Sequence, residues 1–356
     1  MNDNFNSEDM TLCIAIPTFN RAIRLEKALH DLCNHILCAR GKKHISVYVS
    51  NNGSSDATAA VLDEYIKIFR GCNVSYAFDN VPLNAGFDAN VLNCYCNANG
   101  RYVWFLADDD NLEVGSIDSI LEDIDRNDPA VIYYNFGQEP YTFQSPYIKE
   151  SVLYARIDDA SVGAISKIIN YPKLTSVVLK RDLEKVGSKI KKTCSVEISR
   201  SYGYIHCALV IQAAFELGNV FLSNKFIAFS DPDYMDHIDF PPYVGGELVE
   251  IVDILLEANG KQFLKSAFSF ELADPLTTSM NTLATYYRGR IVLTPELKAE
   301  LEGTIRNSLK INKVFNVNFL MHFLRLIFAL GYARVLSLYK GRPITKLKGR
   351  SDSYAP

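Results

Sequence analysis

Three adjacent carboxylates, Asp108, Asp109 and Asp110, follow directly after the apolar stretch RYVWFLA at residues 101–107. Carboxylates held side by side at the end of a buried strand repel one another, and a divalent cation with oxygen ligands relieves that repulsion. Mg²⁺ or Mn²⁺ at this place would neutralise a diphosphate leaving group. The alternative is a solvated acidic turn that caps the next helix, and the triplet alone does not separate the two.

Small and amide-bearing residues follow three other predicted strands. Each group taken singly is ordinary turn chemistry, but parallel strands place their carboxyl ends, and the ligands that bind there, along one edge of a sheet. The sequence therefore predicts that these groups and the acidic triplet share one rim. The candidate residues are Pro17, Thr18, Asn20 and Arg21, then Asn51 and Asn52, then Asn84, Gly86 and Asn90.

The elements that position these residues alternate between strand and helix. Apolar runs predict strands, and apolar residues at helical spacing predict the helices between them. This order favours a mainly parallel α/β sheet with helices on both faces, over residues 1–240, followed by a helical region at 241–356. The predicted strands are 11–16, 44–50, 74–79, 101–107, 130–136, 174–180 and 220–230, and the predicted helices are 23–37, 57–69, 90–96 and 208–219.

In this order, the four motifs resemble the family 2 glycosyltransferases of the GT-A fold, over roughly residues 10–235. The resemblance implies a nucleotide-sugar donor, a divalent metal ion, Mg²⁺ or Mn²⁺, and transfer of one sugar to a hydroxyl. It puts Asn51 in the place of the family's base-binding aspartate and Asp108–Asp110 at its DxD site. The triplet allows two registers, and we assign Asp109 and Asp110 to the metal. The residues then expected around the nucleotide sugar are Pro17, Thr18, Asn20, Arg21, Asn51, Asn52, Asn84, Gly86, Asn90 and Asp108.

Two details of the motifs refine the resemblance. Asn51 and Asn52 stand where Asp-Asp is frequent, so the base contact would be an amide hydrogen bond. The stretches YVWFLADDDN and NAGFDANVLN look most like the branch of abequosyltransferases and other O-antigen sugar transferases. That branch implies a bacterial enzyme of surface polysaccharide synthesis with a glycan acceptor on a lipid carrier.

The catalytic base is where the sequence departs most from the family, which commonly supplies a carboxylate before a late helix. His206 stands at that place, ahead of the apolar helical stretch ALVIQAAFELGN. A helix N-terminus disfavours the charged imidazolium, which would leave a neutral imidazole able to accept a proton. A core histidine bonded to a carbonyl, Glu197 as the base, and a retaining mechanism without such a base remain alternatives.

Charge is unevenly distributed along the 356 residues. Residues 303–350 hold ten Lys or Arg and no Asp or Glu, so the remainder, with 27 basic and 41 acidic residues, carries −14. Apolar residues mixed with arginines in this region suit a helix on an anionic membrane surface as well as a packed helix pair with a basic tail. We expect a place at the cytoplasmic face of the cell membrane, because the N-terminus lacks a secretory signal and no CxxC pair occurs.

Other functional interpretations have less support in the sequence. A sugar nucleotidyltransferase needs a Gly-rich, basic loop after its first strand, and IPTFNR has none. A non-catalytic sugar-binding protein of the same fold is the rival from another class. The acidic stretch SDPDYMDHID at 230–239 is interpreted as a solvated loop, with a lid over the donor or a late histidine ligand for the metal as the alternatives. We expect no nucleic-acid partner.

Overall fold

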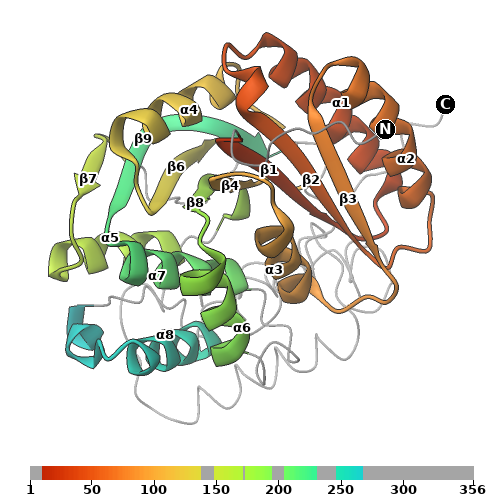
Figure 1. The fold of residues 1–356 in the computed structure, drawn as a ribbon. Helices are drawn as coiled ribbons and strands as arrows, with labels where there is room; N and C mark the ends of the chain where they lie inside the picture. The colour runs from red at the N-terminus through yellow and green to blue at the C-terminus, as the bar shows by residue number, and fades with distance from the viewer. Residues whose placement is uncertain (1–9, 138–147, 171–172, 195–203, 231–245, 268–356) are drawn as a thin grey trace, which may run out of the picture. The chain divides into compact units, whose positions relative to one another are not determined.

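A computed structural model describes five stretches of the chain: residues 10–137, 148–170, 173–194, 204–230 and 246–267 (Figure 1). Contacts divide the chain into two compact units, and the first comprises Met1–Pro232 and Glu250–Phe270. Except for residues 246–249, every described residue belongs to this first unit.

Four parallel strands and three helices form the N-terminal half. β1 lies between β2 and β4, and β3 pairs with the outer side of β2. The elements are β1 Leu12–Thr18, α1 Ala22–Cys38, β2 Ile45–Asn52, α2 Thr58–Gly71, β3 Ser75–Val81, α3 Phe87–Asn97 and β4 Tyr102–Phe105. Each was predicted from the sequence pattern, with bounds that differ by a few residues.

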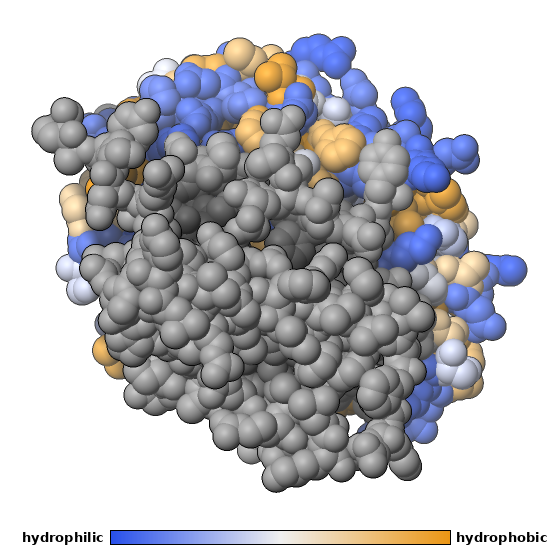
Figure 2. Space-filling view, turned by 180° about the vertical axis from the view of Figure 1, so that it is seen from behind, coloured by the Kyte–Doolittle hydropathy of each residue, from blue (hydrophilic) through white to orange (hydrophobic). Residues whose placement is uncertain are grey.

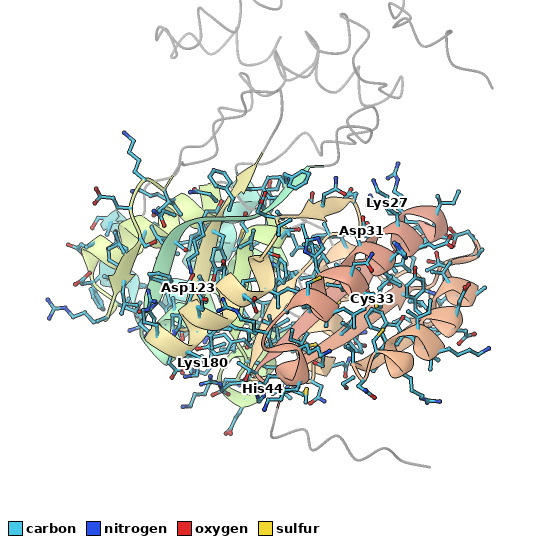
Figure 3. All side chains as sticks on the ribbon, turned by 90° about the horizontal axis from the view of Figure 1, so that it is seen from above. Lys27, Asp31, Cys33, His44, Asp123 and Lys180 are labelled. Atoms are coloured by element: carbon cyan, nitrogen blue, oxygen red, sulfur yellow. The ribbon has the colours of Figure 1, made fainter. Side chains whose placement is uncertain are left out.

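Both faces of β1 and β2 are covered, and every position of the two strands is buried; β1 is apolar almost throughout, whereas β2 also buries serine and asparagine side chains. Alternate residues of β1 and β2, such as Ile14 and Val47, join one core cluster with α1 and α2. The opposite face contacts α3, where Asn93 donates to the hydroxyls of Tyr48 and Ser50. Figure 3 shows α1, which carries Asp31 and Cys33, lying on the outside of the sheet.

The second half of the sheet is mixed rather than parallel. β9 pairs in parallel with β6 and antiparallel with β5 and β7, and β8 runs antiparallel between β4 and β6. The remaining strands are β5 Asp110–Leu112, β6 Val131–Gly137, β7 Val152–Tyr154, β8 Val177–Lys180 and β9 Val220–Ser230. The helices are α4 Ser116–Asn127, α5 Asp159–Asn170, α6 Lys189–Cys194, α7 Ile205–Leu217 and α8 Gly246–Ala258.

Strand β5 is the unexpected element, because it begins at Asp110 inside the acidic triplet. Its residues Asp110 and Leu112 pair with Ser230 and Ala228 of β9. The acidic triplet is therefore a link between two strands of one sheet, and not only the turn that caps the next helix.

The loop after β2 is locked to the loop after β3 by one amide side chain. Asn52 donates from Nδ2 to Asn84 Oδ1 at 2.8 Å and to the Gly86 carbonyl at 3.0 Å, and its Oδ1 accepts from the Ala85 N–H. Gly53 follows with φ +72°, and a Cβ there would lie 2.7 Å from the backbone N of Asn84. The close approach of the two loops thus requires glycine.

Helix α7 is buried at every position from Ile205 to Phe215, which fits its predominantly apolar sequence. Its first backbone N–H donates to Asp88 Oδ1 of α3 at 3.2 Å, so a carboxylate in α3 satisfies one of the N–H groups that a helix start leaves without an intrahelical partner. No helix in the described stretches combines the length and apolar character that crossing a bilayer requires. Polar side chains predominate over the described surface in Figure 2.

Asp128 ties the end of α4 to β4 and β8. It accepts from Lys180 Nζ at 2.6 Å, Tyr102 Oη at 2.8 Å and Arg101 Nη1 at 3.0 Å, and its φ of 38° is left-handed. Partial burial disfavours the charged form, but the hydrogen bonds from Lys180 and Tyr102 outweigh it and lower the pKa of this carboxyl.

We predict that Asp128→Asn, which tolerates the same backbone conformation, lowers the free energy of unfolding at pH 7 by about 0.5–1 kcal/mol. Because the folded pKa is lowered, the carboxylate contributes its stability above the unfolded value near 3.8 and loses that contribution as the pH falls through the folded value. The difference between the two proteins should therefore shrink as the pH is lowered below 3.8. Urea unfolding at pH 7 and pH 2.5 measures this. Asp125→Asn on the same helix is the control, and equal losses in both variants contradict the prediction.

We also predict that Gly53→Ala is more destabilising than Gly115→Ala. Gly115 has a similar φ of +77°, but no heavy atom lies within 4 Å of the position that a Cβ would take, so alanine there carries backbone strain of about 1 kcal/mol alone. At Gly53 the clash with Leu83 and Asn84 adds about 1–3 kcal/mol. Urea unfolding compares the two, and equal losses would show that the β2 and β3 loops are not in contact.

Candidate active site

The acidic loop lies at the carboxyl edge of β4, beside the end of β1. Asp108 is almost fully buried, and both of its oxygens are occupied: Thr18 Oγ1 donates to Oδ2 at 2.6 Å, and Arg21 Nη1 donates to Oδ1 at 2.5 Å. Burial raises the pKa of the Asp108 carboxyl, and the Arg21 charge opposes that rise. Asp108 therefore joins the ends of β1 and β4, and each of its oxygens already accepts a hydrogen bond within the protein.

Asp109 shares the same guanidinium. Arg21 Nη1 donates to Asp109 Oδ2 at 3.0 Å, so one nitrogen bridges two neighbouring carboxylates. The Asp109 side chain is 18% exposed against 3% for Asp108. Among the described residues its other oxygen accepts no hydrogen bond, so Asp109 combines access with a vacant acceptor.

Asp110 is held from the other side of the loop. Thr175 Oγ1 donates to Asp110 Oδ2 at 2.5 Å, and no described residue donates to Oδ1. Burial raises the pKa of Asp110 to about 6, although the positive charge of Lys173 opposes the rise. A carboxyl of this kind binds a proton readily in the metal-free protein and would lose it to a divalent cation.

Thr175 was not predicted as a site residue. It lies in the short 3₁₀ turn Leu174–Ser176, 65 residues after Asp110, and nothing in the local pattern LTS pairs it with the acidic loop. Only the pairing of β8 with β4 brings it there.

The polar loops after β1, β2 and β3 are called the first, second and third polar loops. Side chains join the first polar loop to the second. Asn20, at a left-handed φ of 53°, accepts from the Ser55 N–H, and its own N–H donates to Ser54 Oγ. Asp56 accepts from the Ala22 N–H, at the start of α1. Pro17 lies in β1 beyond the last residue that pairs with β4, so its missing N–H breaks no ladder hydrogen bond on that side.

The predicted amide residues of the other loops are close to the same edge. Asn51, opposite Thr18 in the register, is buried; it donates to Asn80 Oδ1 at 2.8 Å and accepts from the Ser54 N–H. Asn90 of α3 donates to the Thr18 carbonyl, which brings the start of α3 against the end of β1. Together with the Asn52 contacts to Asn84 and Gly86, these bonds bring all the predicted nucleotide-sugar residues to one rim.

His206 lies in the first turn of α7 and is buried. Its ring meets the Phe87 ring edge-on, with centroids 6.4 Å apart, and Phe87 follows Gly86 in the third loop. The histidine is thus placed at the contact between the starts of α3 and α7. Glu197, residues 231–239 of the acidic stretch and the basic region at 303–350 lie outside the described residues.

No three His, Cys, Asp or Glu side chains in the described stretches converge into a preformed metal centre. Arg21 draws Asp108 and Asp109 to one side, whereas Thr175 holds Asp110 from β8. The two vacant oxygens, on Asp109 and Asp110, are nevertheless the hard ligands that Mg²⁺ and Mn²⁺ prefer, so the donor set fits such an ion.

Known proteins agree with this architecture. The model of glycosyl transferase family 2 matches residues 13–167. A curated relative, the GalNAc(5)-diNAcBac-PP-undecaprenol beta-1,3-glucosyltransferase of Campylobacter jejuni, is 32% identical over 117 residues, which cover 31% of this chain and 33% of the relative. The chain therefore aligns with about a third of that protein's length.

Solved structures extend the likeness in fold. Staphylococcus aureus TarS 1-349 in complex with UDP has a TM-score of 0.53 at 14% identity, covering 97% of this chain and 98% of that one. The mannosyltransferase PcManGT from Pyrobaculum calidifontis, in complex with GDP-Man and Mn²⁺, has a TM-score of 0.50 at 12% identity, covering 92% and 87%. At such identities the likeness concerns the fold, which is GT-A. The stretch that matches the model of glycosyl transferase family 2 holds the acidic loop and the three polar loops around it.

Proposed function

We propose that the chain is a metal-dependent glycosyltransferase that moves one sugar from a nucleotide-diphosphate sugar to a hydroxyl of a glycan acceptor. The observation that carries the proposal is that the three carboxylates of the acidic loop differ in how many of their oxygens accept hydrogen bonds. Both oxygens of Asp108 accept hydrogen bonds, from Thr18 and Arg21, whereas Asp109 and Asp110 each keep one oxygen that accepts none from any described residue. Two carboxylate oxygens at the edge of a parallel sheet suit a cation bound to a diphosphate.

Asp109 and Asp110 would hold Mg²⁺ or Mn²⁺, which stabilises the negative charge that develops on the departing nucleoside diphosphate. Asp108 holds Thr18 and Arg21 through hydrogen bonds and would not itself be a metal ligand. Arg21, whose side chain is 35% exposed, presents guanidinium N–H groups beside the acidic loop and suits a diphosphate oxygen. Asn51 and Asn80 would read the base through amide hydrogen bonds.

Relatives support the nature of the substrates. The Campylobacter relative is named for an undecaprenol-linked glycan, and TarS has been captured with UDP and with UDP-GlcNAc. We therefore propose a nucleotide-sugar donor and a lipid-linked glycan acceptor in bacterial surface polysaccharide synthesis, of which an O-antigen is one form. We further propose that the basic region at 303–350 contacts an anionic membrane at its cytoplasmic face.

We predict that one nucleotide among UDP, GDP, CDP and dTDP raises the melting temperature in the presence of Mn²⁺. A ligand at 100 times its Kd adds about 2.7 kcal/mol to the free energy of unfolding. Asp109→Asn and Asp110→Asn should each reduce the metal-dependent part of the shift, because each removes one charged oxygen ligand. Asp125→Asn, an exposed acid of α4, should leave it unchanged. Absence of any shift, or undiminished shifts in both site variants, would rule out the metal-dependent transferase.

We propose His206 as the base that takes the proton from the acceptor hydroxyl. Its support is position: it lies at the N-terminal turn of α7, against Phe87 beside the third polar loop. A neutral imidazole is the form that accepts a proton near pH 7.

His206→Gln is expected to lower kcat by roughly 10²–10⁴ with little change in donor affinity, since proton transfer belongs to the chemical step. Single-turnover assays and nucleotide titrations separate the two quantities. His44→Gln is the control and should keep its kcat, because His44 directly precedes β2 and so lies at the opposite end of that strand from the polar loop. A kcat within a few-fold of wild type, with an unchanged melting temperature, would exclude His206 and leave Glu197 as the base to test.

A further inference from the structure

Thr175 is the point at which β8 holds the acidic loop. The residue is fully buried, in the turn Leu174–Ser176 directly before β8. Its Oγ1 donates to Asp110 Oδ2 at 2.5 Å and accepts from the Ala107 N–H at 3.1 Å, and its carbonyl accepts from Trp104 Nε1 at 2.8 Å. One residue thus contacts the loop at both ends and the buried indole of β4.

The direction of these hydrogen bonds follows from the chemistry of the partners. A backbone N–H can only donate, so the bond from Ala107 uses a lone pair of the threonine hydroxyl. The single hydroxyl proton is then available to one acceptor, and the short bond to Asp110 Oδ2 shows where it lies. Thr175 therefore fixes which oxygen of Asp110 is engaged inside the protein and which is left vacant.

We propose that Thr175 is a positioning residue that turns Asp110 Oδ1 toward a divalent cation bound with the donor diphosphate. The inference rests on the proposed function, because it requires that such a cation is bound. Metal-ligating carboxylates are commonly oriented by hydrogen bonds to their second oxygen, and losing such a partner typically weakens metal binding by 10–100-fold. The contrast with Asp108 supports the assignment, since both of its oxygens are bonded within the protein.

Ser176 offers a matched control in the next position. Its hydroxyl is also fully buried, yet it makes no hydrogen bond within the described residues. Removing the Ser176 hydroxyl perturbs the packing of the same turn without touching the acidic loop. Thr175→Val removes the hydroxyl at nearly constant shape, and Thr175→Ser retains the hydroxyl and loses only a methyl group.

The test is a Mn²⁺ titration of the full chain, with free Mn²⁺ followed by electron paramagnetic resonance at a fixed concentration of the nucleoside diphosphate that stabilises the wild type. Thr175→Val should weaken Mn²⁺ binding about tenfold or more, whereas Thr175→Ser and Ser176→Ala should stay within about threefold of wild type. Melting temperatures confirm that every variant is folded. This readout measures binding and does not depend on turnover.

A double-mutant cycle separates positioning from a general loss of structure. If Thr175 acts through Asp110, Thr175→Val should have less than about a twofold effect once Asp110 is Asn, since the oriented ligand is already removed. A tenfold loss in both backgrounds, or an unchanged Kd in Thr175→Val, overturns the inference while the transferase proposal stands. A wild-type chain that binds no Mn²⁺ with any nucleotide overturns both.

Discussion

The interaction on which the site depends is the bridge from one Arg21 nitrogen to Asp108 and Asp109. Three consecutive carboxylates at the end of a buried strand repel one another, and Asp108 has almost no water to stabilise its charge. Arg21 supplies the missing positive charge, and Thr18 supplies a further hydrogen bond. Because both residues lie at the end of β1, this bridge fixes the first polar loop against β4 and so sets the geometry of the whole rim.

The other loops are held mainly by neutral amides. Asn20 joins the β1 loop to the β2 loop, Asn52 joins the β2 loop to the β3 loop, and Asn90 returns from α3 to the Thr18 carbonyl. Amide side chains both donate and accept, so they connect loops without adding charge beside the aspartates. The acidic loop therefore keeps its charge for a ligand, and Thr175 on the opposite side restrains the one carboxylate that Arg21 does not contact.

Periodicity predicted the elements that position the site, because each is long and its burial follows a regular pattern. The spacing of Leu25, Leu29, Leu32 and Ile36 predicted α1, and uninterrupted apolar runs predicted the strands covered on both faces. Strand β5 escaped prediction because it has three residues, two of them polar, and exists through pairing with β9 more than 100 residues later. The antiparallel direction of β8 could not be predicted either, because the sequence of a strand does not indicate its direction relative to its neighbours.

The sequence by itself determined which chemical groups gather at the rim: each polar loop directly follows a strand, and strands of a parallel sheet end at one edge. It thereby identified the acidic triplet, the amide loops and the family they resemble. Only the tertiary structure decided which carboxylate oxygens are engaged and which are vacant. Thr18 meets Asp108 across 90 residues and Thr175 meets Asp110 across 65. Such contacts depend on the order of the strands and on the exact positions of donor and acceptor atoms. Both result from the packing of segments that are distant in sequence, so neither produces a local pattern in the chain.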